Sequence, residues 1–124
     1  MTSSHRDFDR VAYQRVVDTL SARDGFMAKL LHIAFGGDVS AGRIAQELHC
    51  TEDSALRLAM MRSPSTERDK FRHDIARIAV ATGIDAALLS AIIRRARALS
   101  AFATAAAANM LMAARDQLPD DEDH

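Results

Sequence analysis

The chain has 124 residues, 48% of them apolar and 27% charged, which is the composition of one globular domain. Two prolines, five glycines and an aromatic content of 5% leave too few turn and strand residues for a β-sandwich or a barrel. One cysteine excludes an internal disulfide and is typical of a reducing cytoplasm, and the N-terminal residues lack the apolar stretch of a secretory signal. We therefore expect a cytoplasmic, all-α domain of five to six helices over residues 1–118.

The net charge of −1 is unevenly distributed along the chain. Residues 39–97 carry ten Arg and Lys against seven Asp and Glu, which gives +3, whereas residues 98–124 carry one Arg against five acids, which gives −4. A basic excess of this size is small for a domain that binds nucleic acid tightly. Residues 119–124 are predicted to form an acidic, disordered tail.

Apolar residues at three- and four-residue steps predict two helices in the first third of the chain, over residues 7–20 and about 26–34. Ser21 and Asp24 have the spacing of a capping box for the second helix. The glycine pair at 36–37 is expected to end that helix, because glycine readily adopts the left-handed conformation.

Three more helices are predicted in the middle of the chain. Ser40 and Thr51 are placed to cap the third and the fourth, and Pro64 separates the fourth from the fifth. The fifth helix is predicted over residues 66–82, with Gly83 at its end.

A long, alanine-rich helix is predicted over residues 86–117, with Asp85 as its cap. Residues 98–114 contain no charge, but they are too few and too rich in alanine for a membrane span, so we expect protein to cover them. Apolar residues at heptad-like steps predict a seam for a homodimer, with closure of a monomer core as the alternative. The seam residues are Leu89, Ile92, Leu99, Phe102, Met110 and Leu111.

Two stretches of the chain align with each other as copies of an internal repeat. The sequence Arg-Ile-Ala occurs at 43–45 and again at 77–79, and each copy is followed by a tight turn and a second helix. The turn holds Gly83 in the second copy and His49 in the first, a departure because a positive φ is usually needed there.

Residues 43–62 and 77–95 resemble the helix-turn-helix class of bacterial DNA-binding proteins. The resemblance implies a tri-helical core, with units at about 40–62 and 74–97, and a small transcriptional regulator that binds double-stranded DNA. Four residues are then expected to contact the duplex, mainly through its phosphates. They are Arg43, Thr51, Arg57 and Arg62.

Other features favour a protein-binding regulator or adaptor that uses the same fold without DNA. The second helix of the first unit begins with Glu52 and Asp53, which repel phosphate. Leu56 lies on the side that would face the duplex, and as an apolar residue it is expected to be buried or covered by a partner. The acidic tail also favours this alternative.

No pattern in the sequence indicates an enzyme, a metal site or a cofactor. The five histidines have no ligand-like spacing with one another or with Cys50. Neither a glycine-rich phosphate loop nor a nucleophile elbow occurs. Cys50 corresponds to Ile84 in the second copy of the repeat, which predicts a buried, small apolar side chain. We expect no enzymatic activity.

Overall fold

The computed structural model describes the backbone of residues 2–117 and the side chains of residues 10–115; the tail expected at 119–124 lies outside this range. The described residues form six helices and no β-sheet, which confirms the all-α fold and the long C-terminal helix. The helices are α1 (Thr2–Leu20), α2 (Met27–Ala34), α3 (Ala41–Leu48), α4 (Glu52–Ala59), α5 (Arg68–Thr82) and α6 (Ala86–Gln117).

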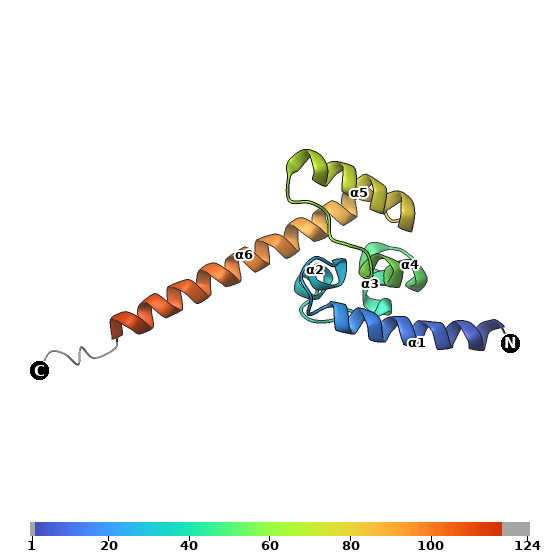
Figure 1. Cartoon of the computed structure of the whole chain (residues 1–124), viewed down its shortest axis with the longest axis horizontal. Helices are drawn as coiled ribbons and strands as arrows, with labels where there is room; N and C mark the ends of the chain where they lie inside the picture. Colours follow the sequence, from blue (N-terminus) through green and yellow to red (C-terminus); the bar gives the residue numbers. More distant parts are fainter. Residues whose placement is uncertain (1, 118–124) are drawn as a thin grey trace, which may run out of the picture.

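The helices form a small body from which α6 projects (Figure 1). Helix α4 contacts α1, α2, α3 and α5 and keeps one exposed face. Helix α6 packs against α5 and α2 through its first turns and then continues away from the body as a single rod (Figure 1). At 1.5 Å per residue, its 32 residues span about 48 Å.

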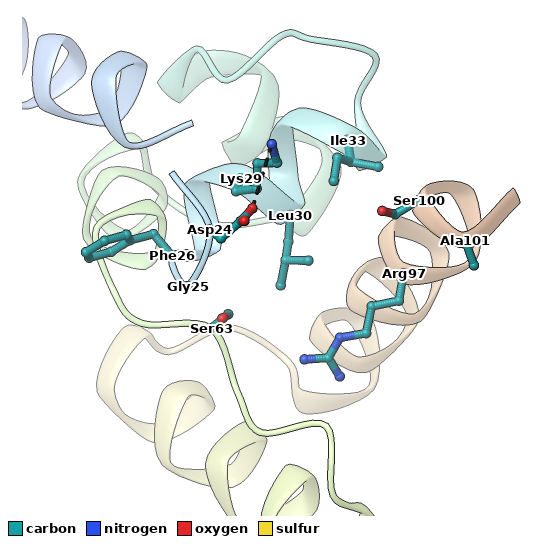
Figure 2. Close-up of a pocket in the computed structure, with 10 residues that line it drawn as sticks. All are labelled: Asp24, Gly25, Phe26, Lys29, Leu30, Ile33, Ser63, Arg97, Ser100 and Ala101. Carbon is teal, nitrogen blue, oxygen red and sulfur yellow. Dashed lines mark ion pairs between the residues drawn. The ribbon is translucent and has the colours of Figure 1, made fainter. Parts of the chain in front are cut away.

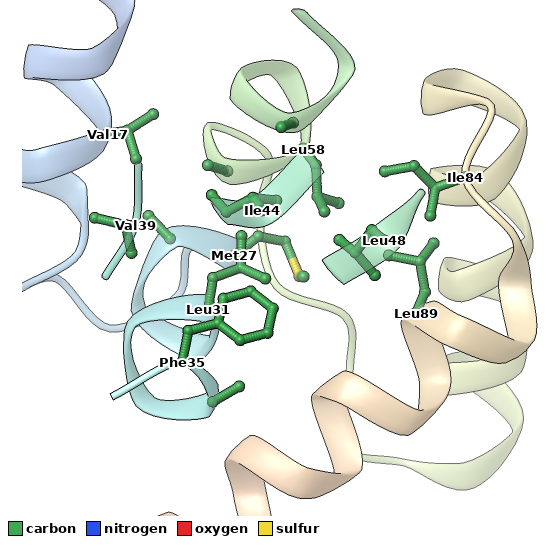
Figure 3. Close-up of a cluster of buried hydrophobic side chains, with 14 of the residues drawn as sticks. Val17, Met27, Leu31, Phe35, Val39, Ile44, Leu48, Leu58, Ile84 and Leu89 are labelled. Carbon is green, nitrogen blue, oxygen red and sulfur yellow. The ribbon is translucent and has the colours of Figure 1, made fainter. Parts of the chain in front are cut away.

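The core lies where α2, α3 and α4 meet the start of α6. Figure 3 shows side chains from all of these helices, and from α1, packed into one cluster. The largest fully buried members are Met27, Leu31, Ile44, Leu48, Leu56, Leu58, Leu89, Ile93 and Val17. Of the two alternatives for Leu56, burial or cover by a partner, the structure has the first: the side chain is only 1% exposed, because neighbouring helices pack against it.

The two repeat copies fold with the same turn. The backbone N–H of His49 donates to Ala45 O in the first copy, and that of Gly83 donates to Ala79 O in the second. Both turn residues are left-handed, with φ of 53° at His49 and 73° at Gly83. His49 therefore takes the conformation that usually favours glycine.

The predicted caps of these units are confirmed, whereas the capping box predicted for α2 at Ser21 and Asp24 is wrong. Thr51 Oγ1 accepts the amide of Ser54 at 3.1 Å. At α2, however, Ser21 Oγ donates to Asp18 O at the end of α1, and the helix begins only at Met27. The Met27 amide donates to Met61 O at 2.8 Å, so a contact with a distant segment fixes this boundary.

Candidate interaction surfaces

The structure gives Arg43 several partners within its own neighbourhood. Its Nε lies 3.2 Å from Glu47 Oε2, its Nη1 lies 3.8 Å from Asp38 Oδ2, and its guanidinium lies over the ring of Phe35. The Ser40 amide donates to Asp38 Oδ1 at 3.0 Å, and this bond holds the pKa of Asp38 below its usual value. Arg43 is thus a local structural contact of α3, and only part of its charge remains available to a ligand.

The other three predicted DNA contacts are placed differently. Thr51 uses its hydroxyl as the cap of α4. Arg57 and Arg62 are exposed; Arg57 Nη1 lies 3.5 Å from Ala81 O, and the Arg62 guanidinium lies over the ring of Phe26. The four predicted contacts therefore serve separate local roles.

The acidic start of α4 is partly neutralised by one arginine of α1. Arg10 Nη1 lies 3.4 Å from Glu52 Oε1, and Arg10 Nε lies 3.2 Å from Asp53 Oδ1. A recognition helix must offer a free face and a free N-terminal end to the major groove. The exposed face of α4 carries Glu52, Asp53 and Arg57, and Arg10 pairs with the two acids at its N-terminus, so this geometry is poorly suited to reading bases.

Three arginines line one hollow at the start of α5, with a volume of about 460 Å³. Arg68 comes from α5, and Arg94 and Arg97 come from α6; Thr66 and Phe71 complete the lining. Arg97 Nη2 donates to Pro64 O at 2.8 Å, its guanidinium lies over Phe71, and burial lowers its pKa. Among the described residues, Arg68 and Arg94 make no ion pair, so they remain available to an anion. The spacing of residues in the sequence does not indicate this hollow, because its residues come from separate helices.

A second hollow, of about 350 Å³, lies where α6 leaves the body. Figure 2 shows Leu30 and Ile33 of α2 facing Ser100 and Ala101 of α6, with the Arg97 side chain along the same wall. The ion pair of Asp24 and Lys29 also lines the hollow (Figure 2), which is therefore a corner of mixed apolar and charged character between the body and the projecting part of α6.

The predicted seam is divided by the edge of the body. Leu89 is fully buried and Ile92 partly buried within the core of the single chain, so Leu89 is not available to a partner. The rest of the seam is open to solvent. The exposed fractions are 43% for Leu99, 74% for Phe102, 72% for Met110 and 71% for Leu111.

Five further large apolar side chains are exposed outside the predicted seam. They are Met112 on α6, Val80 on α5, which is 86% exposed, and Val11, Tyr13 and Val16 on α1, which are 44–55% exposed. Val80 also lines a hollow of about 390 Å³ with His73 and Arg77. A single exposed valine is ordinary on a protein surface, whereas several large apolar residues on one projecting helix are not.

Comparisons of this chain with protein-family models, with curated proteins and with solved structures found no match. Within the described residues, no three His, Cys, Asp or Glu side chains gather as ligands for a metal ion. In the same part of the chain, no helix combines the length and the hydropathy that crossing a membrane requires.

Proposed function

We propose that the chain is a protein-binding regulator or adaptor whose docking element is residues 98–114 of α6. The observation that carries this proposal is the solvent exposure of large apolar side chains on a helix that projects from the body. Ser100, Thr104 and Asn109 are the polar residues of this segment, so the helix is apolar on nearly every side. Covering such a helix with another protein is favourable, because each Å² of apolar surface removed from water lowers the free energy by about 25 cal/mol.

The arrangement of α4 gives this function more support than base-specific DNA reading. The helix that the helix-turn-helix resemblance assigns to the major groove presents carboxylates at its exposed N-terminal end, and these are paired with Arg10. A cytoplasmic location, suggested by the single cysteine, belongs to the same proposal.

Affinity capture from a lysate of the source organism tests the docking element. The parent chain is compared with Phe102→Glu and with the matched control Val80→Glu, which places the same charge at an exposed apolar position on α5. We expect the parent and Val80→Glu to retain the same proteins and Phe102→Glu to lose them. Equal capture by all three chains would remove α6 from the proposal. Circular dichroism verifies that each variant is folded.

A second candidate function is weakly sequence-dependent binding to DNA phosphates, as in a transcriptional regulator. It is favoured by the hollow lined by Arg68, Arg94 and Arg97. Residues 57–97 around it carry nine Arg and Lys against four Asp and Glu, a net charge of +5. Backbone contacts of this kind position a protein on a duplex without reading its sequence.

Fluorescence anisotropy with a random-sequence duplex at low and moderate salt tests this second candidate. Arg68→Gln combined with Arg94→Gln is expected to weaken binding and to lower the slope of log K against log salt by about 2. Arg23→Gln, an exposed arginine in the loop before α2, is the control. Absence of binding at low salt, or equal losses in the two variants, would exclude the hollow as a DNA site.

A further inference from the structure

The charges on either side of residues 98–114 have opposite signs. On the N-terminal side lie Arg94 and Arg95, both exposed and without an ion pair among the described residues. On the C-terminal side, Arg115 is followed by five acids: Asp116, Asp120, Asp121, Glu122 and Asp123. An uncharged helix with a basic region before it and an acidic region after it is complementary in charge to a reversed copy of itself.

The apolar side chains of one face are arranged symmetrically about Ala106. Phe102 and Met110 lie four residues before and after it, and Leu99 and Ala113 lie seven residues before and after it. Steps of four and seven residues keep all five side chains on one face of a helix. The four outer residues are exposed and Ala106 is partly so, and this face therefore stays open from the body outward.

We infer that two copies of the chain associate through α6 in antiparallel orientation, with Ala106 at the two-fold axis; this rests on the proposed docking function. In this register Phe102 meets Met110 of the second copy, a favourable contact between an aromatic ring and a thioether, and Leu99 meets Ala113. The small side chain of Ala106 allows the two helices to approach closely at the centre.

The same register brings the acidic segment of each copy to the arginines of the other. Asp116 lies ten positions after Ala106 in the sequence, and Asp120 lies four positions further on. Arg95 and Arg94 lie eleven and twelve positions before Ala106, at a similar distance on the opposite side. A parallel pair would instead place arginine beside arginine and acid beside acid, which is unfavourable. Charge therefore selects the antiparallel orientation.

The acidic segment of one chain cannot neutralise the arginines of that same chain. The rise of the helix separates Arg94 from Gln117 by about 35 Å along its axis. The six residues that follow Gln117, up to Asp123, span at most about 21 Å when fully extended. Within one chain these acids therefore do not reach Arg94, whereas the antiparallel register of a second copy brings the two ends of the sequence together.

Analytical ultracentrifugation and disulfide trapping test the association and its orientation. We expect a dimer whose dissociation constant rises about tenfold or more in Phe102→Glu and is unchanged in Val80→Glu. Leu99→Cys and Ala113→Cys chains, each made with Cys50→Ala, are then mixed and oxidised. Antiparallel pairing predicts the mixed 99–113 disulfide, since the two α-carbons must approach to about 4.4–6.8 Å.

Charge reversal tests the ends of the interface. Arg94→Glu with Arg95→Glu is expected to weaken the dimer about threefold, in the range of exposed ion pairs. Adding Asp120→Lys and Asp121→Lys to the same chain restores the attraction in an antiparallel dimer. If the variant with all four substitutions still has the weakened dissociation constant, the antiparallel register is contradicted.

Two results overturn the inference, and they have different consequences for the proposed docking function. A dimer that forms 99–99 and 113–113 disulfides in place of the mixed one has the parallel orientation. A chain that stays monomeric up to about 1 mM, the weak limit of specific association, does not pair at all. If this monomer still captures proteins in a Phe102-dependent way, the proposed docking function holds and only self-association fails; without capture, both fail.

Discussion

Helix α4 and the outer half of α6, residues 98–115, both carry apolar side chains at three- and four-residue steps but have opposite surroundings. In the eight residues of α4, all four apolar positions from Ala55 to Ala59 are buried. In the outer half of α6, Phe102 and Met110 are mostly exposed. Three- and four-residue steps occur in both helices, so the pattern marks the face that needs a partner without specifying which partner covers it.

The difference follows from the neighbours that each helix has. Four other helices lie around α4, whereas α6 passes α5 and α2 and then leaves the body (Figure 1). Leu89 near the start of α6 and Leu99 further along it belong to one predicted seam. Leu89 lies in the core and Leu99 at the surface, because the body ends between these two residues.

The largest expected effect is a difference in the stability lost when an apolar side chain is removed from each of the two regions. Leu56→Ala removes a buried side chain from α4 and should lower the free energy of unfolding by about 2–5 kcal/mol. Phe102→Ala removes a larger but exposed side chain from α6 and should change it by less than about 0.5 kcal/mol in dilute solution. Urea denaturation followed by circular dichroism measures both. Similar losses would mean that the outer half of α6 is part of the folding core.

A smaller effect is expected from two threonines in different positions. Thr51→Ala removes the side-chain cap of α4 and should cost about 1 kcal/mol of unfolding free energy. Thr104 lies inside α6, where its hydroxyl donates to Ser100 O, and Thr104→Ala should be neutral or slightly stabilising. The same urea titration compares them, and equal losses would argue against a special role for the cap.

The smallest expected effect concerns the turn before α4. His49 adopts a left-handed conformation that is unfavourable for a side chain with a Cβ, so His49→Gly should raise the free energy of unfolding by about 0.5–1 kcal/mol. Gly83→Ala, at the equivalent turn before α6, should lower it by about 1 kcal/mol. Thermal denaturation with both variants measures the pair. A loss of stability in His49→Gly would show that the imidazole itself stabilises the turn.

The amino-acid sequence by itself determined the helical class, most helix ends and the equivalence of the two turns. Thr51 and Asp85 cap α4 and α6 through amides only three residues away, and Gly83 ends α5 through its own φ. Such interactions involve neighbours along the chain, so the local sequence is sufficient to predict them.

The tertiary structure alone decided which apolar faces are covered and which basic residues meet. Leu56 is buried because distant segments pack around α4, and α2 begins at Met27 because its amide bonds to Met61. Arg68 and Arg94 belong to different helices, and they line one hollow because α5 packs on α6. Burial and proximity of this kind depend on contacts between segments far apart in the chain, which the spacing of residues does not encode.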